Sequence, residues 1–195
     1  GFTTNPSLLK SAHLYISYMD YACLIANDSE LRGMPKSFEV IADDLEEMES
    51  QARQIASWGE NVYVKIPITN TQGESTGPIC RRLGKDGIKL NVTAITTLKQ
   101  IETAARNLIY APAILSIFCG RIADTGKDPV PFITKALMVK SPLTQVLWAS
   151  TREVYNYYQA RQAGADIITM IPSLIKKLLE FKDMNLEELS LKTVK

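Results

Sequence analysis

The chain has 195 residues, of which 46% are hydrophobic, and a formal net charge of +1. This length favours one domain over two, and the small net charge gives no general attraction to nucleic acid or to a membrane surface. No apolar run approaches the roughly 18 residues of a membrane span, and no secretory signal is visible, so a cytoplasmic protein is expected. Three cysteines (Cys23, Cys80 and Cys119) and a single histidine argue against a structural zinc site, and the thiols are expected to be reduced.

Short β-rich runs alternate with longer helical runs along the chain. Seven such β-then-α units are predicted, in chain order: strand 1–4 with a helix from Ser7 as N-cap towards Ala26; strand 36–42 with helix 43–59; strand 61–68 with a helix towards Leu83; strand 88–95 with helix 96–109; strand 113–122 with helix 132–140; strand 144–150 with helix 151–164; and strand 166–172 with helix 173–181. A further helical stretch begins near residue 184.

This alternation predicts a parallel sheet covered by helices. An open doubly wound sheet and a closed (β/α)8 barrel compete, but no glycine-rich phosphate loop appears early in the chain. The predicted strands repeatedly end near polar residues, namely Asn5, Glu39, Lys65, Thr93, Arg121 and Ser150. Barrel enzymes build their sites from such residues at the carboxyl ends of strands. We therefore predict an α/β fold, a (β/α)8 TIM barrel lacking its first strand, formed by residues 1–195 as a single domain.

Lys65 is the most informative of these residues, because it interrupts the apolar strand "NVYVKIPI". One interpretation is a lysine at an exposed strand edge whose ammonium group reaches water. The other is a lysine that forms a Schiff base, for which the amine must be neutral. Apolar neighbours such as Val64 and Ile66 would penalise the charged form. Position alone leaves both interpretations open.

Several motifs then occur in a specific order: "GFTTNPSLL", "SFEV", "NVYVKIP", "KLNVTAI", "LSIFCGRIADTG" and "WASTR". Together they resemble the transaldolase family, including its small members and the related fructose-6-phosphate aldolases. The resemblance covers nearly the whole chain.

The resemblance implies a role for each matching residue. Lys65 would form the imine with a ketose phosphate, Glu39 would orient a catalytic water, and Thr93 would help to hold that water. The positions that would bind substrate are Asn5, Ser116, Phe118, Arg121, Ser150 and Arg152. The last three would bind the phosphate group of the substrate. Without the resemblance, Asn5 reads as a turn residue before a proline and either arginine reads as a surface residue.

The implied activity is transfer of a dihydroxyacetone unit from a ketose phosphate to an aldose phosphate, without a metal or an organic cofactor. An aldolase of the fructose-6-phosphate type and a non-catalytic sugar-phosphate-binding barrel are the alternatives. Glu39 and Phe118 favour the transferase, because the aldolase branch has glutamine and tyrosine at these positions.

Two further implications concern parts that the motifs do not cover. The family's acid/base aspartate is on a strand that would precede Gly1, so we expect part of the native protein to lie outside the 195 residues. Small members of the family are commonly ring-shaped, so a homo-oligomer, a pentamer or decamer, is expected.

Overall fold

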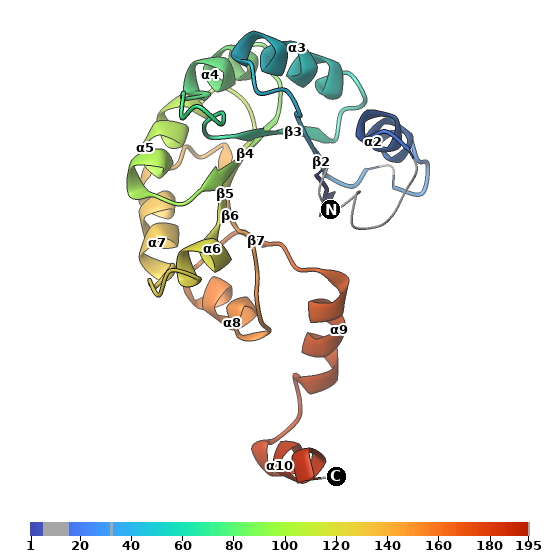
Figure 1. Cartoon of the computed structure of the whole chain (residues 1–195), viewed down its shortest axis with the longest axis vertical. Helices are drawn as coiled ribbons and strands as arrows, with labels where there is room; N and C mark the ends of the chain where they lie inside the picture. The colour runs from blue at the N-terminus through green and yellow to red at the C-terminus, as the bar shows by residue number, and fades with distance from the viewer. Residues whose placement is uncertain (6–15, 32, 195) are drawn as a thin grey trace.

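A computed structural model describes residues 1–5, 16–31 and 33–194 of the chain. Seven parallel strands form one sheet in the order of the sequence (Figure 1). They are β1 (Phe2–Thr3), β2 (Lys36–Glu39), β3 (Val62–Pro67), β4 (Leu90–Ile95), β5 (Ala113–Ile117), β6 (Thr144–Trp148) and β7 (Ile167–Ile168). The sheet curls so that helices cover its convex side (Figure 1). This arrangement confirms the predicted (β/α)8 TIM-barrel fold with one strand fewer.

The helices follow the strands as the alternation predicted. They are α2 (Tyr18–Ala26), α3 (Leu45–Ala56), α4 (Gly77–Lys85), α5 (Leu98–Asn107), α6 (Cys119–Ala123), α7 (Val130–Val139), α8 (Tyr155–Gln162), α9 (Pro172–Phe181) and α10 (Leu186–Val194). The last two lie beyond β7, away from the curled sheet (Figure 1). No helix among the described residues has both the length and the apolar character needed to cross a bilayer.

Several element boundaries differ from the prediction, as in β7, which is shorter than the predicted strand 166–172, and two of the differences have a clear local cause. The helix that ends at Ala26 begins at Tyr18, because the Ser17 hydroxyl accepts the backbone N–H of Asp20 and caps it there. The predicted cap, Ser7, lies outside the described residues. The predicted strand over 113–122 stops at Ile117, and the apolar residues after it form the short helix α6.

The two faces of the sheet differ in chemistry because successive side chains of a strand point to opposite sides. Val64 and Ile66 are completely buried in the large core that includes residues of the covering helices. Lys65 therefore points to the concave face. The prediction that valine and isoleucine surround its amine is wrong, since strand alternation turns them away from it.

Candidate active site

The centre of the concave face is an ion pair between neighbouring strands. Glu39 and Lys65 are register partners at the carboxyl ends of β2 and β3. The Lys65 ammonium donates to a Glu39 carboxylate oxygen at 3.1 Å, and the two side chains are 10% and 20% exposed. The carboxylate fixes the position of the amine. Lys65 is thus neither a lysine reaching for water at an edge nor an amine in an apolar pocket.

Thr93 lies on the adjacent strand β4, where it is paired in register with Pro67 of β3. It is 1% exposed, and its hydroxyl has no hydrogen-bond partner among the described residues. Buried hydroxyls nearly always have a partner, and those that lack one call for an explanation. The Thr93 hydroxyl can bond a water or a substrate group next to the ion pair, as the resemblance implies.

A buried chain of polar side chains crosses the same face. The Ser116 hydroxyl donates to Asn91 Oδ1 at 2.6 Å, and Asn91 Nδ2 donates to the Ser37 hydroxyl at 3.0 Å. Asn91 is also the register partner of Lys65. Sequence reasoning missed Ser37 and Asn91, although the alternation of Asn91, Val92 and Thr93 was a usable signal. Ser116, predicted to contact substrate, is 2% exposed and engaged in this chain.

Asn5 and Phe118 extend the concave face on either side. Asn5 is half-buried and follows β1, next to Thr4, whose N–H donates to the Ser37 carbonyl at 3.1 Å. Phe118 packs against a small cluster formed by Ile114, Leu147 and Ala149. Asn5 therefore follows the end of its strand, as predicted, whereas Phe118, predicted within the strand 113–122, lies just beyond the end of β5.

The two arginines predicted to bind phosphate both interact with one aspartate. Arg152 donates from Nε and Nη2 to the two carboxylate oxygens of Asp124, at 3.1 and 2.7 Å. These hydrogen bonds are the main reason why the pKa of Asp124 lies below its usual value, and the charge of Arg121 adds to the effect. Arg121 is exposed on α6 rather than at a strand end. Sequence reasoning missed Asp124, whose side chain interacts electrostatically with both arginines.

Ser150 and Gly120 bring α6 against the end of β6. Ser150 has φ +64°, a left-handed conformation that is costly for a residue other than glycine and is often found at functional sites. A Cβ atom at Gly120 would collide with the Ser150 carbonyl oxygen. Glycine is therefore required where the chain turns from β5 into α6.

Comparisons with known proteins identify the family of the chain. The family model described as Transaldolase/Fructose-6-phosphate aldolase matches residues 1–194. The chain belongs to this transaldolase/fructose-6-phosphate aldolase family. A probable transaldolase of Methanococcus maripaludis is 36% identical over 182 residues, which are 91% of this chain and 79% of the relative. A probable transaldolase of Dehalococcoides mccartyi is 32% identical over 185 residues, 92% and 80% of the two chains.

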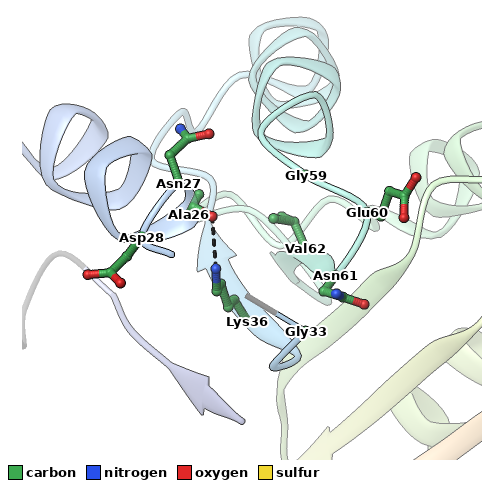
Figure 2. A pocket seen from close by; sticks show the side chains of 9 residues that line it. All are labelled: Ala26, Asn27, Asp28, Gly33, Lys36, Gly59, Glu60, Asn61 and Val62. Carbon is green, nitrogen blue, oxygen red and sulfur yellow. Dashed lines mark hydrogen bonds between the residues drawn. The ribbon is translucent and has the colours of Figure 1, made fainter. Parts of the chain in front are cut away.

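Within this transaldolase/fructose-6-phosphate aldolase fold, a second buried lysine provides a contrast to Lys65. Lys36 is 4% exposed at the amino-terminal end of β2, and its ammonium donates to the Ala26 carbonyl at 2.8 Å (Figure 2). A cation there stabilises the carbonyl end of α2. The pocket of about 300 Å³ beside it lies at the strand ends opposite to Glu39 and Lys65. Lys36 therefore has a structural explanation.

Among the described residues no three His, Cys, Asp or Glu side chains gather as a metal site would require.

Replacing Gly120 by alanine is expected to lower the free energy of unfolding by about 2–4 kcal/mol, because either α6 or the Ser150 backbone must move. Urea denaturation measures the change. The matched control is Gly84→Ala in α4, where the nearest atom to a new Cβ is Tyr110 Cβ at 3.7 Å. That change is expected to be neutral or stabilising by up to about 1 kcal/mol. Equal stability of the two variants would contradict the close approach at Ser150.

Proposed function

We propose that the protein is a transaldolase that transfers a dihydroxyacetone unit from a ketose phosphate to an aldose phosphate through a Schiff base on Lys65. The Lys65–Glu39 pair carries the proposal. A solitary lysine on the concave face could be structural, but this one has a carboxylate at 3.1 Å that can accept and return protons. The buried Thr93 hydroxyl lies on the next strand, where it can hold a water.

The reaction begins when the neutral Lys65 amine adds to the C2 carbonyl of the ketose. Proton transfer to the C2 hydroxyl and loss of water give an iminium ion. A base then removes the C4 hydroxyl proton, the C3–C4 bond breaks, and its electron pair moves into the iminium to form an enamine. The shortened aldose leaves. C3 of the enamine then attacks the carbonyl carbon of the acceptor aldehyde, whose oxygen takes up the proton that the base removed. Water added to the new iminium releases the product ketose and the free amine. Glu39 is placed to exchange protons with Lys65 in the steps that lose and add water.

We assign phosphate binding to Arg152 and Arg121. Asp124 occupies Nε and Nη2 of Arg152. A guanidinium group has five N–H donors, so Nη1 and the second proton of Nη2 remain for phosphate oxygens. Arg121, with its charge near the same aspartate, supplies a second guanidinium group. Asp124 thus holds Arg152 in a fixed orientation while leaving it able to bind an anion.

Borohydride trapping tests the proposal. The native protein is mixed with fructose 6-phosphate, reduced with borohydride, digested and analysed by mass spectrometry. A three-carbon or six-carbon adduct on Lys65 is expected, and its absence there would overturn the Schiff-base assignment. Turnover with and without erythrose 4-phosphate then distinguishes transfer from aldolase cleavage. Turnover that does not depend on the acceptor would favour the aldolase alternative.

A further inference from the structure

Tyr18 contacts the site from a helix, not from a strand. It lies in the first turn of α2 and is 8% exposed. Its hydroxyl oxygen accepts the backbone N–H of Glu39 at 2.6 Å. This hydrogen bond joins α2 to the strand residue whose carboxylate is paired with Lys65.

The hydrogen bond occurs at the end of β2, just beyond the residues that pair with β1. Along β2 the N–H groups of Lys36 and Val40 donate to β3 residues or their flank, so the N–H of Glu39 faces the β1 side. From that side, Thr4 N–H donates to the Ser37 carbonyl, and β1 ends at Thr3. Glu39 is therefore one position beyond the reach of β1. The Tyr18 hydroxyl takes the place that a strand carbonyl would have and satisfies this part-buried donor.

The hydroxyl is suited to holding this position and not to exchanging protons. Burial, opposed by the hydrogen bond to the Glu39 backbone and supported by the Glu39 charge, raises the pKa of Tyr18 to about 12. The phenol thus keeps its proton at any pH near neutrality. An uncharged acceptor fixes the backbone of Glu39 without adding a second negative charge next to its carboxylate.

We infer that Tyr18 is a positioning residue, which holds the end of β2 so that the Glu39 carboxylate stays in hydrogen-bonding distance of the Lys65 amine. This inference rests on the proposed function, because it assigns Tyr18 a part in the chemistry of the same pair. Tyr18 acts through Glu39 and not on the substrate. The resemblance to the family implies no role for this position, which lies 21 positions before Glu39 in the chain.

Tyr18→Phe tests the inference because it removes only the hydroxyl. The initial rate of borohydride-trapped adduct formation on Lys65 is expected to fall about five- to tenfold, the kinetic equivalent of one net hydrogen bond. Tyr21→Phe on the same helix is the matched control and is expected to trap at the native rate, since Tyr21 is half-buried and no hydrogen bond of its hydroxyl is seen in the described structure.

A double-mutant cycle separates positioning from a general effect on folding. If Tyr18 acts through the Glu39 carboxylate, adding Tyr18→Phe to Glu39→Gln causes little further loss of rate. If Tyr18 only stabilises α2, the two losses multiply, and the inference is overturned. Failure of the native protein to form any adduct would instead count against the proposed function.

Two measurements do not depend on sugar chemistry. Reductive methylation of Lys65, followed by mass spectrometry, is expected to be faster in Tyr18→Phe and in Glu39→Gln than in the native protein or Tyr21→Phe, because the amine is held less firmly by its carboxylate. In the native protein, the backbone amide of Glu39 is expected to exchange slowly with deuterium. Unchanged methylation in Tyr18→Phe, or an amide that exchanges as fast as a free one, would refute the positioning role even if the variant folds poorly.

Discussion

Lys65→Met is expected to abolish the trapped adduct and to reduce turnover by roughly 10⁴-fold or more, as the loss of a covalent nucleophile does in other enzymes. Methionine matches the lysine stem in length but cannot form an imine. The measurements are mass spectrometry after borohydride treatment and steady-state transfer from fructose 6-phosphate to erythrose 4-phosphate. Persistence of an adduct at another lysine, with turnover retained, would show that the amine has been assigned to the wrong residue.

Stability gives a second readout of the same change. Lys65→Met leaves the Glu39 carboxylate, 20% exposed, without its cationic partner. We expect the free energy of unfolding to fall by about 1–3 kcal/mol, between the values for an exposed and a fully buried pair. Lys65→Arg retains the positive charge but cannot form an imine, so it should recover stability without recovering activity. Lys99→Met, at an exposed position on α5, is expected to change neither property.

The barrel architecture could be predicted because its signal is local. In each β-then-α unit the spacing of apolar residues changes from that of a strand to that of a helix, and polar residues mark the carboxyl ends of the strands. The short helix α6 could not be predicted in this way. Residues Phe118 to Ile122 look like a continuation of β5, and the turn depends on Gly120 fitting against the Ser150 backbone. That contact joins positions thirty residues apart and leaves no periodic trace in the sequence.

The candidate site, too, has a part that could be predicted from local signals and a part that depends on contacts between distant residues. Lys65, Glu39 and Thr93 were predicted from strand ends and motifs, and the parallel register brings them to adjacent strands. The surroundings of the amine were predicted wrongly, because its neighbours in sequence were taken as its neighbours in space. Alternation places Val64 and Ile66 behind the sheet. The actual neighbours come from other strands, and no pattern within β3 specifies them.

Asp124 and Tyr18 illustrate what lies beyond such reasoning. Asp124 lies in a polar loop region that looks solvated, and its role depends on the side chain of Arg152 reaching back to it. Tyr18 looks like one apolar position of an amphipathic helix. Its hydroxyl matters only because β1 is too short to satisfy the Glu39 N–H. In both cases the hydrogen-bond partner belongs to another element of the fold, and the sequence around the residue does not specify it.

Glu39→Gln is expected to reduce steady-state transfer by about 10²-fold, the lower range for loss of a general acid/base group. Glutamine has nearly the same size and retains an oxygen that can accept a hydrogen bond from Lys65, so the fold should be kept, although the neutral amide holds the amine less firmly than the carboxylate does. What it loses is the ability to take a proton and return it when water leaves or adds. Hydrolysis of the imine should then become the slowest step, so trapped adduct should accumulate during turnover.

Rapid-quench trapping of Lys65 during turnover measures this accumulation, and Glu47→Gln, at an exposed position on α3, is the control. A Glu39→Gln variant that turns over at the native rate would remove Glu39 from the chemistry and leave it as a counter-ion.

The double variant Glu39→Gln with Phe118→Tyr extends the test, since the resemblance associates these residues with aldolase cleavage. If a phenol at position 118 can supply the proton that the carboxylate no longer handles, release of free dihydroxyacetone should rise relative to transfer. Because Phe118 packs on the concave face beside Leu147, the new hydroxyl group would be introduced on the same side of the sheet as Lys65.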